Sequence, residues 1–144
     1  MFSHLDLICK DVEASKIFYQ KVLKPINVSL LMTLEKETYN VYALGQRTPD
    51  LWLIPCDDKQ LDFKKLGHLC FKANSKAAVD AFYEAALLAG GTDNGKPGYR
   101  DYVDGYYAAY VFDLDGRPIE MLYFDFFTFL YRKFIGLFQR TKKQ

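Results

Sequence analysis

The sequence predicts an α+β fold of two β-α-β-β-β modules, which would place eight strands in one mixed sheet with the helices on its outer side. Three observations support this prediction. Residues 4–23 repeat as residues 68–87 at a constant offset of 64 positions and without a gap. Each copy opens with a short apolar stretch of β-preferring residues and continues at helical spacing. The chain has 144 residues, which suits one compact domain or two small halves that share a core.

The repeat is too regular to be a chance match, because six of the 20 paired positions carry the same residue. In the first copy these are His4, Leu5, Ala14, Phe18, Tyr19 and Leu23. Their partners in the second copy are His68, Leu69, Ala78, Phe82, Tyr83 and Leu87.

In the first copy, residues 5–9 are predicted to form a buried strand, and Asp11 is the candidate N-cap of the following helix. Apolar residues then recur at helical spacing up to Lys24 and Pro25, where the proline ends the helix. Three further strands are predicted, over residues 27–34, 40–44 and 51–54.

The second copy begins in the same way, with a strand over residues 69–71 and Ser75 as the candidate N-cap. Gly90 and Gly91 end its helix. Residues 90–100 are predicted as a Gly/Pro-rich loop. The last predicted elements are strands over residues 106–113 and 119–124, joined by a turn over residues 114–118.

Composition excludes several classes of protein. The chain is 50% hydrophobic, so intrinsic disorder is excluded. Its 19 basic and 18 acidic side chains nearly cancel, so the protein has no overall positive potential that would attract nucleic acid. No apolar run reaches the ~18 residues of a spanning helix, and we expect no signal peptide at the N-terminus. The three cysteines form no CxxC pair and two lie in apolar runs, so we interpret them as reduced core residues of a cytoplasmic protein.

The repeat, its paired histidines and the closing stretch DLDGRPIEM resemble the glyoxalase/bleomycin-resistance/dioxygenase group, also called the vicinal oxygen chelate superfamily. The similarity covers about residues 2–124, which divides the chain into a domain at 1–124, with modules 1–64 and 65–124, and a tail at 125–144. The resemblance implies a curved, incomplete barrel around a divalent metal that binds a small-molecule substrate. In this group the metal site is often shared across a dimer, so we expect a homodimer.

Three residues are the candidate metal ligands. His4 and His68 are the only histidines and occupy the same repeat position, and Glu120 lies in an apolar strand where a carboxylate needs a partner. Two imidazoles and one carboxylate suit Zn, Ni, Mn or Fe, with positions left for water and substrate. Mapping the family's ligand positions onto this chain gives the same three residues. The alternative is that both histidines are ordinary core residues.

Glu120 is also the candidate catalytic residue, because it or a metal-bound water would handle protons while the metal acts as a Lewis acid. Some members of the resembled group use a fourth, acidic ligand. In this chain Trp52 or its neighbour falls at that position, with Asp50 at the entry of the strand, so we predict a three-ligand site.

Several residues are candidates for binding substrate. Side chains in and just after the Gly/Pro-rich stretch would contact an anionic or oxygen-rich molecule, namely Arg100, Tyr102 and Tyr107, with Lys96 and Tyr106 as further candidates. The alternative for this stretch is an ordinary surface turn. Trp52 would stack on a planar ligand, or else belongs to the core.

Three functions remain open at this stage. The first is a metal-dependent enzyme of lyase, isomerase or oxygenase type, the second a non-catalytic binding or resistance protein, and the third a degenerate member kept as a structural module. The intact set of His4, His68 and Glu120 favours the enzyme.

The tail at 125–144 has five basic residues and one acidic residue, and its apolar residues recur at helical spacing. We expect a helix that packs on the protein itself, on the exposed side of the sheet or on a partner subunit. Contact with an anionic membrane surface is the less favoured alternative.

Overall fold

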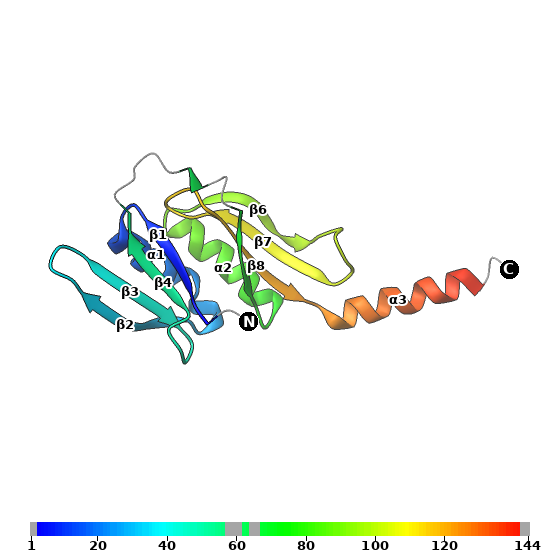
Figure 1. The fold of residues 1–144 in the computed structure, drawn as a ribbon. Coiled ribbons are helices and arrows are strands. Elements are labelled where there is room, and N and C mark those ends of the chain that lie inside the picture. Colours follow the sequence, from blue (N-terminus) through cyan, green and yellow to red (C-terminus); the bar gives the residue numbers. More distant parts are fainter. Residues whose placement is uncertain (1–2, 57–61, 64–66, 142–144) are drawn as a thin grey trace.

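The computed structural model describes residues 3–56, 62–63 and 67–141. The first module consists of β1 (Leu5–Cys9), α1 (Val12–Val22), the short 3-10 helix η1 (Lys24–Ile26), β2 (Ser29–Glu35), β3 (Asn40–Gly45) and β4 (Leu51–Pro55). The second consists of β5 (Leu69–Lys72), α2 (Lys76–Leu88), β6 (Thr92–Tyr99), β7 (Tyr106–Phe112) and β8 (Pro118–Phe124). Helix α3 (Phe126–Thr141) follows directly (Figure 1).

The predicted fold class is confirmed, since both modules have the β-α-β-β-β order and each forms a mixed sheet. The sheet orders are β1-β4-β3-β2 and β5-β8-β7-β6, and the pairs β1–β4 and β5–β8 are parallel. The prediction of a single eight-stranded sheet is wrong for one chain, because each module forms its own four-stranded sheet. Strands β1, β2, β5 and β6 are the end strands of the two sheets, so four strand edges have no paired neighbour among the described residues.

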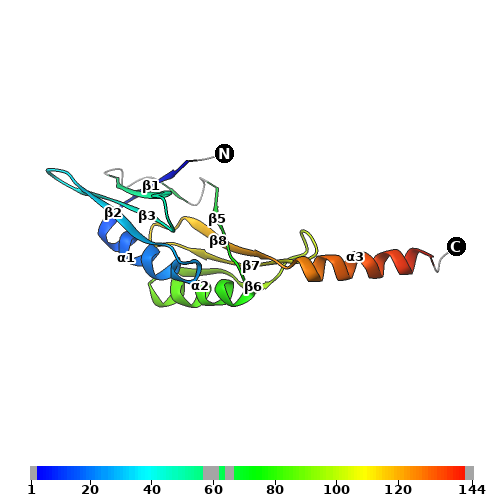
Figure 2. The same cartoon turned by 90° about the horizontal axis from the view of Figure 1, so that it is seen from below.

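Helices α1 and α2 lie on the same side of the two sheets (Figure 2). Each begins at the predicted N-cap: the Asp11 carboxylate accepts the N–H of Ala14, and the Ser75 hydroxyl accepts the N–H of Ala78. The core lies between helices and sheets and includes the fully buried Phe82 of α2. We call the opposite side of each sheet, which none of the described helices covers, its open face.

Strand β6 corrects the prediction of a Gly/Pro-rich loop over residues 90–100. The segment pairs antiparallel with β7, with register irregularities on both sides of Gly95. Gly95 has φ +149°, and Pro97 lies on a sheet edge, where its missing N–H donor does no harm. Pairing with the strongly β-forming β7 therefore overrides a local composition that favours turns.

A buried polar network joins the second module to the first. At the turn before β8, the Asp113 carboxylate accepts hydrogen bonds from the Tyr19 hydroxyl of α1 at 2.6 Å and from Arg117 Nη1 at 2.7 Å. Arg117 also donates through Nη2 to the Ile8 carbonyl of β1 at 2.7 Å. The Asp113 and Arg117 side chains are both buried. This network holds β1 close to the β7–β8 turn although no strand pairing joins the two sheets.

Helix α3 projects from the body and packs along neither sheet in either view (Figures 1 and 2). Its contacts with the body lie in its first two turns, where Phe129 meets Phe124 and Arg132 pairs with Asp104. The predicted helix is confirmed, but packing on the sheet of its own chain, one of the two expected places, is wrong. Within the described residues, no helix is long and apolar enough to cross a membrane.

Candidate metal centre

Glu120 is a buried carboxylate on the open face of the second sheet. Its neighbours in β8, Ile119 and Met121, are fully buried in the core on the helix side, so the alternation of the strand turns Glu120 the other way. The residue is nevertheless only 1% exposed. A carboxylate at such a position requires partners, as the sequence indicates.

Both carboxylate oxygens of Glu120 have partners. Oε1 accepts hydrogen bonds from the Tyr106 hydroxyl at 2.6 Å and the Tyr110 hydroxyl at 2.8 Å, both on β7. Oε2 lies 3.0 Å from Nε2 of His68, the residue that precedes β5. Three strands of one sheet therefore place an imidazole, a carboxylate and two phenols together.

The carboxylate changes the acidity of its neighbours. Burial, together with the hydrogen bond to Glu120, raises the pKa of Tyr106 to about 12. The same causes raise the pKa of Tyr110 further. Although Cys70 is exposed as a residue, the protein atoms around its thiol desolvate it, and this desolvation, together with the charge of Glu120, raises the pKa of the thiol to about 12. The phenols therefore stay protonated at neutral pH and act as hydrogen-bond donors that orient Glu120.

One chain supplies an incomplete ligand set. Among the described residues, no three His, Cys, Asp or Glu side chains form a group that could hold a metal ion. The structure brings His68 and Glu120 together, whereas His4 lies just before β1, with its ring in edge contact with Trp52 of β4 at 6.4 Å. Trp52 stands between the buried Leu51 and Leu53, so both His4 and Trp52 belong to the open face of the first sheet.

The strand registers show that Trp52 and Glu120 hold equivalent positions in the two modules. Asp6 pairs with Trp52 across β1 and β4, and Cys70, the repeat partner of Asp6, pairs with Glu120 across β5 and β8. An indole therefore stands where the second module has its acid. The three-ligand site stays a prediction, and Trp52 is the residue at this strand position.

The similarity of the chain to known proteins extends over both modules. The model of the glyoxalase/bleomycin resistance protein/dioxygenase superfamily matches residues 1–121. The chain belongs to this superfamily. A comparison with curated proteins gives no match.

Several solved structures of the superfamily fold are similar to the chain. A glyoxalase/bleomycin resistance protein from Albidiferax ferrireducens T118 is 29% identical, with TM-score 0.69, over 85% of this chain and 98% of that one. A FosX variant from Listeria monocytogenes, a fosfomycin resistance protein in complex with Mn(II) and a dihydroxypropylphosphonic acid, is 19% identical with TM-score 0.64, over 85% of this chain and 88% of that one. A glyoxalase I variant from Zea mays is 23% identical with TM-score 0.66, and the match covers 86% of this chain but 47% of that one.

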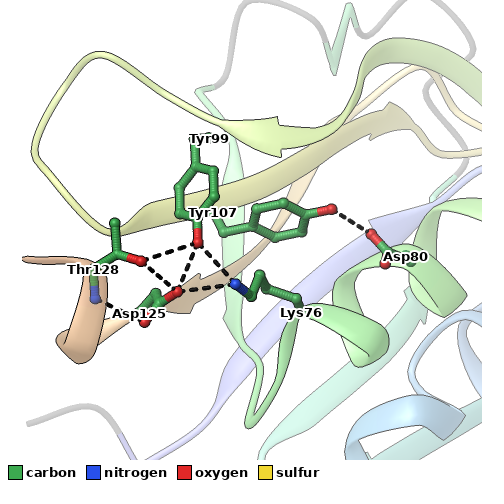
Figure 3. A network of polar contacts seen from close by, with 6 residues as sticks. All are labelled: Lys76, Asp80, Tyr99, Tyr107, Asp125 and Thr128. Carbon is green, nitrogen blue, oxygen red and sulfur yellow. Dashed lines mark hydrogen bonds and ion pairs between the residues drawn. The ribbon is translucent and has the colours of Figure 1, made fainter.

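The predicted substrate-binding residues of this superfamily member separate into two groups. The Arg100 guanidinium lies over the Tyr110 ring at 5.2 Å, and the Tyr102 ring meets the Tyr106 ring edge-on at 5.5 Å. Both are therefore next to the tyrosines that contact Glu120. Tyr107 faces the other way, and its hydroxyl donates to Asp80 of α2 at 2.8 Å (Figure 3). The structure does not bring Tyr107 to the cluster.

Beside His68, the gap between the two sheets opens into a hollow of about 180 Å³. Its lining comes from both modules and includes Asp6 of β1, His68 and the buried Arg117. The candidate metal centre thus lies at the edge where the first module meets the second.

The sequence interpretation missed two residues of the cluster. Tyr110 shares a strand face with Tyr106 and is paired directly with Glu120, so the period-2 spacing of β7 would have identified it. Cys70 was interpreted as a core residue, which is wrong, because it is exposed and lies opposite Glu120. An exposed cysteine in an apolar run has no distinctive sequence signal. The interpretation as a core residue holds for Cys9, which is buried.

Proposed function

We propose that the chain is a divalent-metal-dependent enzyme of lyase, isomerase or oxygenase type that acts on a small oxygen-rich molecule chelated through adjacent oxygens. The observation that carries the proposal is the arrangement around Glu120. A buried carboxylate beside an imidazole, held by two phenol donors, is the ligand and outer-shell pattern of a protein metal site. A purely structural acid would not need to face an open side of the sheet.

His68 and Glu120 fit a divalent cation by their chemistry, because imidazole nitrogen and carboxylate oxygen suit Zn, Ni, Mn or Fe. We assign the third ligand to His4 of a second copy of the chain. His4 lies on the open face of the first sheet, and the open face of the second sheet carries the other two ligands. A homodimer that packs the first module of one chain against the second module of the other would cover both open faces.

The bound metal would polarise adjacent substrate oxygens as a Lewis acid. The residues of the chain have separate tasks. Tyr106 and Tyr110 fix the carboxylate of Glu120, which is the candidate group for moving a proton. Arg100 and Tyr102, at the edge of the cluster, would bind the oxygen-rich part of the substrate. Arg100 forms no ion pair with any described carboxylate, so its charge is available to an anionic group.

Trp52 supports a second candidate function, that of a small-molecule binding or resistance protein without catalysis. The indole occupies the position equivalent to Glu120 and is half-buried, with its Nε1 donating to the Pro49 carbonyl at 2.8 Å. A rigid aromatic side chain on the open face is a stacking surface for a planar ligand. Ligand binding by metal-free protein at wild-type affinity, without turnover in any metal form, would favour this function.

Metal analysis of the purified protein tests the proposed centre. After chelator treatment and addition of Zn, Ni, Mn or Fe(II) separately, we expect one metal ion per chain for the preferred ion. H68A and E120Q should each lose it, and the exposed-site control E84Q should retain it. Retention of metal by both H68A and E120Q would refute the site.

Subunit mixing tests whether the ligands come from two chains. H4A and E120Q each lack one ligand, but a mixed dimer has one site that contains both defects and one intact site. Random exchange would make half of the dimers mixed, so metal binding should recover to about a quarter of the wild-type sites. No recovery after exchange would show that His4 does not complete the site from a second copy.

A further inference from the structure

Helix α3 is joined to the body without a linker and is held there by a polar network. Asp125, the only residue between β8 and α3, is buried, and its Oδ2 accepts hydrogen bonds from the Tyr99 hydroxyl at 2.6 Å and from Lys76 Nζ at 3.0 Å (Figure 3). Its Oδ1 accepts the backbone N–H of Thr128 at 3.1 Å and so caps the helix. The direction of α3 is therefore fixed relative to β6 and α2.

Beyond this junction the helix exposes large apolar side chains. Phe127 is 81% exposed, Tyr131 68% and Phe134 58%. On a wheel of 100° per residue these three share one side with Phe126 and Leu130, and Leu137 and Phe138 continue the pattern in the sequence. Over the five residues whose side chains the structure describes, the apolar arc spans roughly 140°, and four of these five are aromatic.

Every charged residue after Asp125 is basic. Arg132 and Lys133 fall outside the apolar arc, on the side where Phe129 packs against Phe124 of the body, and Arg140, Lys142 and Lys143 come later in the sequence. The one described acidic partner is Asp104, whose 3.2 Å pair with Arg132 is exposed on both sides and therefore weak. The helix thus combines an aromatic face with a cationic polar face of a single sign.

We propose that α3 binds an anionic lipid surface, lying in the plane of the headgroups with its aromatic face in the acyl boundary and its basic residues among the anionic headgroups. A strong apolar and cationic asymmetry without an apolar span is typical of interfacial helices. Charge complementarity supports lipid as the occupant, because each Lys or Arg near an anionic leaflet adds to the attraction.

A second copy of the chain fits this helix less well. Helix pairing uses a narrow seam of two positions in seven, mostly aliphatic, whereas this arc is wide and aromatic. The superfamily fold is also complete before the helix begins, since the family model ends at residue 121 and the relative from Albidiferax ferrireducens T118 is matched over 98% of its length by 85% of this chain. The helix is therefore an addition to the domain, and the proposal does not depend on the metal centre.

Vesicle co-sedimentation of the full chain tests this proposal. We expect binding to vesicles of phosphatidylcholine mixed with phosphatidylserine, and little binding to phosphatidylcholine alone. F127S/F134S removes two exposed aromatic rings and R132Q/K133Q removes two charges, and each should weaken binding roughly tenfold or more. The matched control is L88S, which removes an 89% exposed apolar side chain from the end of α2 and should bind like wild type.

Circular dichroism of each variant shows whether it folds, and light scattering shows its oligomeric state. A loss of vesicle binding can therefore be separated from misfolding and from a change of assembly. Because R132Q/K133Q changes only exposed polar positions, it tests the charge component even where the aromatic variant folds poorly. Wild-type protein that stays in the supernatant with phosphatidylserine vesicles would overturn the proposal. So would an F127S/F134S variant that binds vesicles like wild type but changes oligomeric state, since the aromatic face would then pack on a second copy.

Discussion

Replacing Arg117 by Met tests the network that joins the two modules. Methionine keeps the apolar stem but removes the guanidinium, which lies over the Phe63 ring at 4.4 Å. It removes the buried ion pair with Asp113 at 2.7 Å and the hydrogen bond to the Ile8 carbonyl at 2.7 Å. The change therefore isolates the charge and its hydrogen bonds from the packing.

The expected loss is about 3 kcal/mol in the free energy of unfolding. Removing one partner of a buried pair costs about 3–5 kcal/mol, because the other charge is left without compensation. The lower end applies here, since the Asp113 carboxylate keeps three donors: the Tyr19 hydroxyl and the backbone N–H groups of Asp115 and Arg117. At about 2–4 °C per kcal/mol for a chain of this size, Tm should fall by roughly 6–12 °C.

Urea unfolding followed by circular dichroism measures the loss. The matched control is R132M, the same substitution in the exposed pair of Arg132 with Asp104, where we expect less than about 1 kcal/mol. A double-mutant cycle of R117M with D113N should give a coupling energy of about 2 kcal/mol. If R117M cost no more than R132M, the network would not hold the modules together and the reasoning would be wrong.

Three further predictions concern the site and the junction with α3. Y110F removes one donor to the buried carboxylate and should lower metal affinity about 10–100-fold in competition with a fluorescent chelator, and unchanged affinity would count against the outer-shell role. G105A should lower the free energy of unfolding in urea by about 2 kcal/mol or more, because Gly105 has φ +85° and an added Cβ would lie 2.4 Å from the Asp125 carbonyl oxygen. A smaller loss would mean that the backbone at the junction with α3 shifts to accommodate the added methyl group. Hydrogen bonds to its carboxylate, of which that from the Tyr99 hydroxyl contributes most, hold the pKa of Asp125 below its usual range. The stability that the ionised carboxylate gives the fold is therefore present above the ordinary aspartate pKa of about 4 and is lost as pH falls. The stability of D125N between about pH 2 and 6 should therefore depend less on pH than that of wild type, and parallel profiles would contradict this.

Local patterns were sufficient to predict most elements of the fold. Strand β1 and both N-caps, Asp11 and Ser75, lie where the sequence predicts them, because apolar spacing and capping act over a few residues. Strand β6 was missed because its stability comes from pairing with β7, and its own glycines and Pro97 favour turns. The separation into two sheets also depends on tertiary packing, which no local pattern specifies.

The candidate site was predictable where an unusual residue stands in an ordinary pattern. Glu120 in an apolar strand and His68 at a repeat position are such residues, and the structure places them 3.0 Å apart. Tyr107 was misassigned because neighbouring strand positions face opposite sides, and a list of tyrosines ignores that alternation. Within one chain His4 lies apart from this pair, because it belongs to the first sheet and the pair to the second.

The equivalence of Trp52 and Glu120 has a consequence for how a ligand sits. Two identical modules facing each other would form a cavity with twofold symmetry, in which a molecule binds equally well in either of two orientations. With an indole on one wall and a carboxylate on the other, these orientations differ in energy: an apolar portion favours the indole and an oxygen-bearing portion the acid. In the proposed dimer, this difference between the two modules would make an asymmetric molecule bind in one preferred orientation, with its oxygen-bearing end at Glu120.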